Sequence, residues 1–108
     1  MRASAYLLQR DTERGLADIA TYIGRKPDEV AGYRVRGLGY FQRGLMVLAK
    51  EDFARCLKLN GSDAQALYAQ GVARELTGDA GGKDDISEAL RIDPTITELM
   101  TAFGVVRK

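Results

Sequence analysis

The chain has no histidine, no tryptophan and a single cysteine among its 108 residues. The absence of histidine excludes catalytic triads that use this residue and every metal site with a histidine ligand. One cysteine, Cys56, excludes a disulfide within the chain. We therefore expect a protein without catalytic activity, which uses no cofactor and no metal ion.

An excess of charge of one sign is also lacking. Sixteen lysines and arginines oppose 15 aspartates and glutamates, which leaves a net charge of +1. A chain with this balance has no overall field that attracts nucleic acid or an anionic membrane, so we expect neither as a partner.

Long apolar runs are missing as well. No run approaches the roughly 18 residues that cross a bilayer, and Met1–Gln9 contains no signal-peptide core. We therefore expect a cytoplasmic protein. Arginine is more frequent than lysine, and alanine and glycine are abundant, which is compatible with a GC-rich bacterial gene.

Three local patterns suggest chemistry at first sight. Gly78–Lys83 is one residue too short for a phosphate-binding loop, and Asp84 stands where such a loop needs Ser or Thr. Three neighbouring aspartates, Asp79, Asp84 and Asp85, lack the ligand spacing of an EF-hand, so we expect no calcium site. Arg34 and Arg36 beside Tyr33 and Tyr40 form an aromatic and basic pattern, but the neutral net charge argues against a nucleic-acid surface.

The sequence does contain an internal repeat. Residues 34 positions apart match, as Ala3, Gly37 and Gly71 do, and so do Ile19 and Phe53. Further matched pairs are Tyr6 and Tyr40, Gly15 and Ala49, Tyr22 and Cys56, Tyr33 and Leu67, and Gly44 and Gly78. Beyond Gly78 the offset is one residue shorter, and it pairs Phe53 with Ile86. Small and apolar positions match while charged positions vary, as a repeating packing unit requires.

Each repeat unit is predicted to contain two helices, because apolar residues recur at a period near 3.6 and no stretch alternates as a strand does. The fold class is therefore all-α. The predicted helices of the complete units are Val30–Arg43, Leu45–Leu59, Ala64–Thr77 and Lys83–Ile92. We divide this single domain into a partial repeat 1–29, a repeat 30–63, a repeat 64–96 and a C-terminal capping helix 96–108. Thr95 and Glu98 have the spacing of a capping box at the start of that last helix.

The repeat resembles the tetratricopeptide repeat. The middle unit contains Tyr33-x2-Arg36-Gly37-x2-Tyr40 and then Ala49-x3-Phe53, at the family's spacing of aromatic, small and large apolar residues. The resemblance implies an α-solenoid of antiparallel helix pairs, closed by a capping helix, that binds other proteins. Met1 enters the first helix about halfway, so either that helix is short or the chain is a fragment of a longer array.

The resemblance also implies where a peptide binds, because in this family the first helices of the units line a concave face. Carried over by position, the peptide-binding residues are Arg34, Leu38, Phe41, Gln42, Gln65, Tyr68, Val72 and Glu75. The alternative that Leu38, Phe41 and Val72 are core residues stays open. Leu38 and Ala69 stand where the family's carboxylate clamp has asparagine, so no such clamp is expected.

The expected function is a non-catalytic scaffold that binds a peptide or partner segment in the concave groove. The alternative is a homo-oligomerisation module, which would associate through the incomplete first repeat and the apolar C-terminal helix. That helix carries Ile96, Leu99, Met100 and Phe103 on one stripe.

Overall fold

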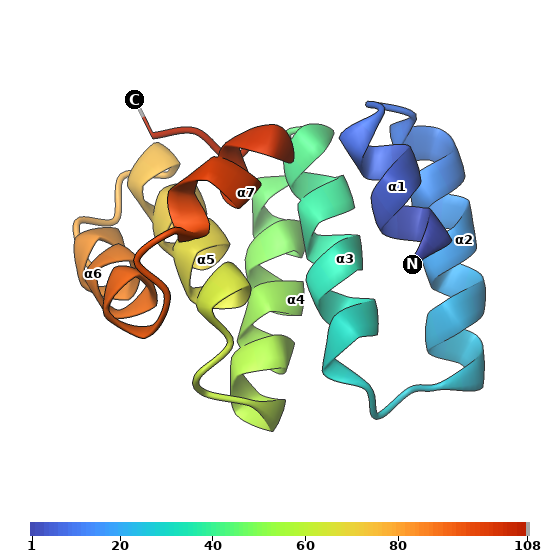
Figure 1. Cartoon of the computed structure of the whole chain (residues 1–108), viewed down its shortest axis with the longest axis horizontal. Helices are drawn as coiled ribbons and strands as arrows, with labels where there is room; N and C mark the ends of the chain where they lie inside the picture. Colours follow the sequence, from blue (N-terminus) through green and yellow to red (C-terminus); the bar gives the residue numbers. More distant parts are fainter. Residues whose placement is uncertain (108) are drawn as a thin grey trace.

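The computed structural model describes residues 1–107, and over these residues the chain forms seven α-helices and no strand (Figure 1). The prediction of an all-α fold is confirmed. The helices are α1 (Arg2–Leu8), α2 (Thr12–Arg25), α3 (Val30–Gln42), α4 (Met46–Leu59), α5 (Ala64–Leu76), α6 (Gly82–Ile92) and α7 (Ile96–Ala102). Within the described range, none of them has the length and apolar character needed to cross a bilayer.

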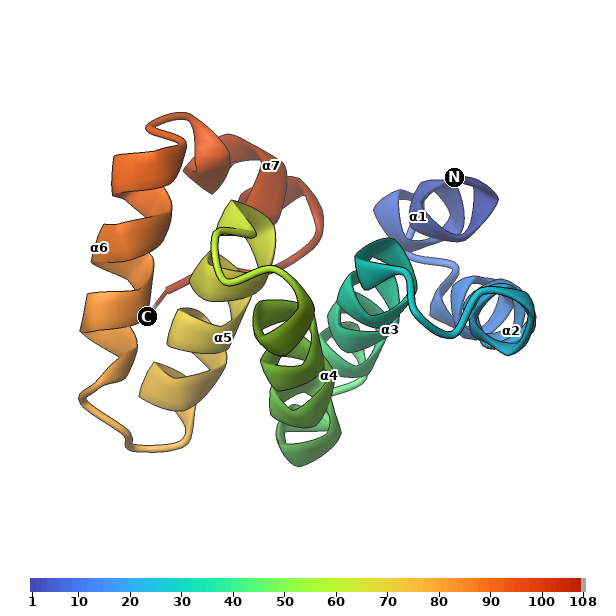
Figure 2. The same ribbon diagram turned by 90° about the horizontal axis from the view of Figure 1, so that it is seen from below.

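The first six helices form three neighbouring pairs, α1 with α2, α3 with α4 and α5 with α6 (Figure 1). The pairs follow one another in a row, because α2 also packs on α3 and α4 packs on α5. Helix α1 contacts α3, and α3 contacts α5. We call the side of the row formed by α1, α3 and α5 the inner face. Figure 2 shows α1 and α7 on this side of the row and α4 on the opposite side.

The repeated small residues lie where two helices of a pair approach most closely. A Cβ atom added to Gly37 of α3 would lie 2.6 Å from the Phe53 ring of α4. A Cβ atom added to Gly71 of α5 would lie 2.6 Å from Ile86 Cγ1 of α6. Phe53 and Ile86 are both buried. The two matched positions of the sequence repeat therefore make equivalent contacts in two successive helix pairs.

The helix ends repeat as well. Gly44 and Gly78 have positive φ angles of 74° and 85°, which allow the chain to leave α3 and α5 in a tight turn. In both turns a backbone N–H donates back to a carbonyl in the last turn of the helix, Leu45 to Tyr40 at 2.9 Å and Asp79 to Arg74 at 2.8 Å.

The C-terminal helix is shorter than predicted. Helix α7 ends at Ala102, where Gly104 takes a φ of 84° and the Val105 N–H donates to Met100 O at 2.9 Å. The predicted capping box does not form, because Thr95 makes no side-chain cap bond and its hydroxyl instead donates to Asp93 at 2.8 Å. Of the predicted helix 96–108, Lys108 lies outside the described residues.

Candidate functional site

The residues predicted to bind a peptide lie on α3 and α5 of the inner face, but four of them are not accessible. Leu38, Phe41, Tyr68 and Val72 have exposed fractions of 1%, 7%, 3% and 0%. These four side chains therefore form no open surface in this structure, and their role in peptide binding stays a prediction. They belong to the hydrophobic core, and helix α7 packs on α5, the helix that carries Tyr68 and Val72 (Figure 1).

Two of the predicted polar residues connect parts of the chain to one another. The Gln42 amide donates to Leu7 O at 2.9 Å and to Phe103 O at 3.0 Å. Arg34 donates to the buried carboxylate of Asp63 at 2.5 Å. Both side chains are therefore occupied by contacts within the chain.

The remaining two predicted residues are Glu75, which forms an ion pair, and Gln65, which is half-buried. Glu75 accepts two hydrogen bonds from the Arg107 guanidinium, both at 3.0 Å. These hydrogen bonds lower the pKa of Glu75 and raise the pKa of Arg107. Gln65 is half-buried at the start of α5.

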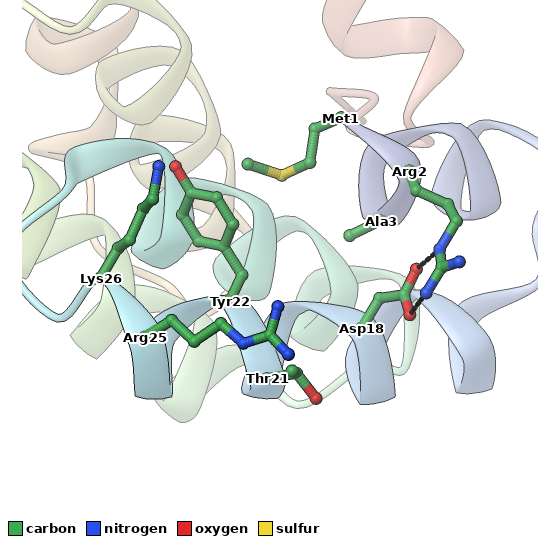
Figure 3. Close-up of a pocket in the computed structure, with 8 residues that line it drawn as sticks. All are labelled: Met1, Arg2, Ala3, Asp18, Thr21, Tyr22, Arg25 and Lys26. Carbon is green, nitrogen blue, oxygen red and sulfur yellow. Dashed lines mark hydrogen bonds and ion pairs between the residues drawn. The ribbon is translucent and has the colours of Figure 1, made fainter.

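An open hollow lies at the other end of the inner face, between the start of α1 and the second half of α2 (Figure 3). Its volume is about 440 Å³. It is lined by Met1, Arg2, Ala3, Asp18, Thr21, Tyr22, Arg25 and Lys26. Arg2 donates two hydrogen bonds to Asp18, at 2.6 and 2.8 Å, which lower the pKa of this carboxyl group. Within residues 1–107 Arg25 has no ion-pair partner, so the hollow presents a cation that is free to meet a ligand.

Sequence analysis missed this hollow, because the repeat predicts that the two helices of the first unit pair but not which part of α2 the first helix leaves uncovered. The available signal was the length of the first helix. Helix α1 has 7 residues and α2 has 14, so α1 leaves the second half of its partner uncovered.

The aromatic and basic pattern of α3 forms an internally neutralised cluster. Arg36 donates two hydrogen bonds to Asp52, at 2.8 and 2.9 Å, and the Asp52 side chain is 3% exposed. The same guanidinium lies 5.8 Å from the ring centres of Tyr33 and Tyr40. Its charge is compensated within the chain, so this cluster offers little attraction to a phosphate backbone.

Cys56 is buried, as expected from its place at a small-residue position of the repeat. Burial, with a smaller contribution from Asp63, raises the pKa of this thiol to about 12. A thiol with such a pKa is a poor nucleophile at neutral pH, because the reactive thiolate is scarcely populated.

The acidic residues near the α5–α6 turn form ion pairs. Asp79 and Asp85 both bind Arg74, at 2.9 and 2.8 Å. Over the described part of the chain, no three His, Cys, Asp or Glu residues gather in a way that could hold a metal ion.

In comparisons with known proteins, no family model matches the chain and no curated protein shows a significant match.

Proposed function

We propose that the chain is a short tetratricopeptide-like α-solenoid that binds a segment of another protein on its inner face. The observation that carries this proposal is a close contact that recurs within two successive units. Gly37 meets Phe53 and Gly71 meets Ile86 at equivalent places in two helix pairs, as in an array whose units stack in one register.

Such an array suits the binding of a partner rather than catalysis. Its inner face is built from helices that are ordered before a partner arrives, so the scaffold itself loses little conformational freedom on binding. A partner segment then supplies side chains for the surfaces that the helices already present.

The hollow beside α1 and α2 is the accessible part of this face, and its charge indicates the chemistry of the partner. Arg2, Arg25 and Lys26 oppose a single lining carboxylate, Asp18, which Arg2 already binds. We propose that a partner segment places a carboxylate beside Arg25 and apolar atoms against Met1 and the Tyr22 ring.

Selection from a displayed peptide library on the full chain tests this function. The selected peptides should contain acidic residues and should bind with affinities that fall at high salt. Arg25→Glu should weaken binding about tenfold. Arg14→Glu is the matched control, because Arg14 is an exposed arginine of the same helix that does not line the hollow. Equal loss in both variants, or no selected peptide, would contradict the proposal.

Homo-oligomerisation is the second candidate. Helix α1 stands at the end of the row, where Met1 and Leu8 are 52% and 46% exposed. Association through the C-terminal helix has less support, because Phe103 and Val105 are buried within the chain. Light scattering over a dilution series tests it, since a self-associating chain gains molar mass with concentration while a monomer does not.

A further inference from the structure

The C-terminal residues 96–107, which we call the C-terminal segment, cover the part of the inner face to which the tetratricopeptide resemblance assigns peptide binding. Helix α7 packs on α5 and α6. The segment buries the side chains of Ile96, Met100, Phe103 and Val105 in the core cluster that also contains Leu38, Phe41, Tyr68 and Val72. A segment of the chain itself therefore lies where a ligand was expected.

The polar contacts of this segment are of the kind that a bound helix makes. Arg10 donates to Ala102 O at 2.7 Å, and Gln42 donates to Phe103 O at 3.0 Å. Both acceptors are backbone carbonyls near the end of α7, where a helix has carbonyls without an internal partner. Any helix that ends at this place offers the same acceptors, whatever its side chains are.

The side chains of the segment supply the sequence-dependent part of the contact. Ile96, Met100 and Phe103 are spaced i, i+4 and i+7, so they share one side of the helical turns that face α5. Arg107 adds the ion pair with Glu75 at the edge of the covered face. The pattern is that of a short amphipathic helix held in an apolar site with a charged contact at its end.

The attachment of this segment is expected to be weaker than that of the longer helices α2 to α6. Helix α7 has 7 residues, which is too short to be helical without tertiary contacts. The burial of four apolar side chains is opposed by the ordering of the whole segment, and these two contributions are of similar size. The segment therefore opens more often than the row of helix pairs unfolds.

We propose that the C-terminal segment is an intramolecular ligand, and that the partner is a short amphipathic helix which displaces it. This partner carries large apolar residues at the spacing of Ile96, Met100 and Phe103, followed by a basic residue that meets Glu75. The inference rests on the proposed function and names the second half of its binding surface.

The test uses the full chain and a synthetic peptide of residues 94–107 as the probe. Arg107→Glu replaces the ion pair with Glu75 by a like-charged contact at an exposed position, so the fold should survive. In this variant the Val105 amide, which donates to Met100 O, should exchange with solvent about two- to fivefold faster than in the wild-type chain. The added peptide should then shift the amide resonances of Tyr68 and Val72.

Arg91→Glu is the matched control. Arg91 is an exposed arginine of α6 that pairs with Glu88, so this substitution makes the same change in net charge away from the C-terminal segment. Exchange at Val105 and the response to the peptide should both remain as in the wild-type chain. A peptide with the same composition in scrambled order should shift neither Tyr68 nor Val72.

Two results would overturn the inference. One is that the Val105 amide exchanges as slowly as the slowest amides of α4, both in the wild-type chain and in Arg107→Glu. The other is an absence of peptide-induced shifts at Tyr68 and Val72 in Arg107→Glu. If library-selected peptides bind at Arg25 while Val105 keeps its protection, the inference fails and the proposed function stands. If no library peptide binds, it is the proposed function that fails.

Discussion

Gly71→Ala is the substitution that tests the helix-pair packing most sharply. The added methyl group would lie 2.6 Å from Gly82 O and 2.6 Å from Ile86 Cγ1, whereas ordinary van der Waals contacts begin at 3.4 Å. Ile86 can shift slightly, but the carbonyl belongs to the backbone of α6. Helices α5 and α6 therefore have to move apart by several tenths of an ångström to accommodate one methyl group.

The expected loss of stability follows from two opposing effects. Overpacking a close contact costs about 1–3 kcal/mol, and the rigid carbonyl places this contact near the upper end. Alanine is better than glycine inside a helix by up to about 1 kcal/mol. The free energy of unfolding should therefore fall by about 2 kcal/mol, which lowers the melting temperature by roughly 8–16 °C in a domain of this size.

Gly24→Ala is the control for this substitution, because Gly24 is helical and a Cβ added there meets nothing within 4 Å. Gly24→Ala should leave stability unchanged or raise it by up to about 1 kcal/mol. Urea denaturation followed by circular dichroism measures both variants. Equal stability of Gly71→Ala and Gly24→Ala would refute the close packing of α5 on α6.

Three further predictions concern the core. Phe53→Ala should cost about 3–5 kcal/mol in urea denaturation, because Phe53 is fully buried against Gly37, and a loss under about 1 kcal/mol would disprove this packing. Asp52→Asn should lower the free energy of unfolding by about 3 kcal/mol, since it leaves the Arg36 charge half-buried without its carboxylate. An unchanged free energy of unfolding would show that the ion pair does not stabilise the fold. Cys56, with its pKa raised to about 12, should react with iodoacetamide at pH 8 only as fast as the chain unfolds, so rapid labelling without denaturant would show that the thiol is accessible.

The helices and their contacts were largely predictable because local sequence determines them. The predicted helix Val30–Arg43 corresponds to α3 at Val30–Gln42, and the glycines at the matched positions lie at the close contacts. Apolar periodicity and glycine placement act over a few residues, so they can be recognised without knowledge of the tertiary structure.

The path of the C-terminal segment was not predictable in this way. Tyr68 and Val72 have the spacing of a helix face, but whether this face meets solvent, a ligand or the chain itself depends on where residues 96–107 go. That path is decided by contacts between distant residues, such as the bond from Arg10 to Ala102 O, and periodicity carries no information about them.

The map of a bound partner on the fold tests the central claim most directly. A library-selected peptide is titrated into the isotope-labelled full chain, and the shifted amide resonances are assigned. Binding on the inner face and in the hollow predicts shifts in α1, the second half of α2, α3, α5 and the C-terminal segment, with the outer residues of α4 and α6 unchanged. Shifts confined to α4 and α6, or none with the peptide in large excess, would contradict the account.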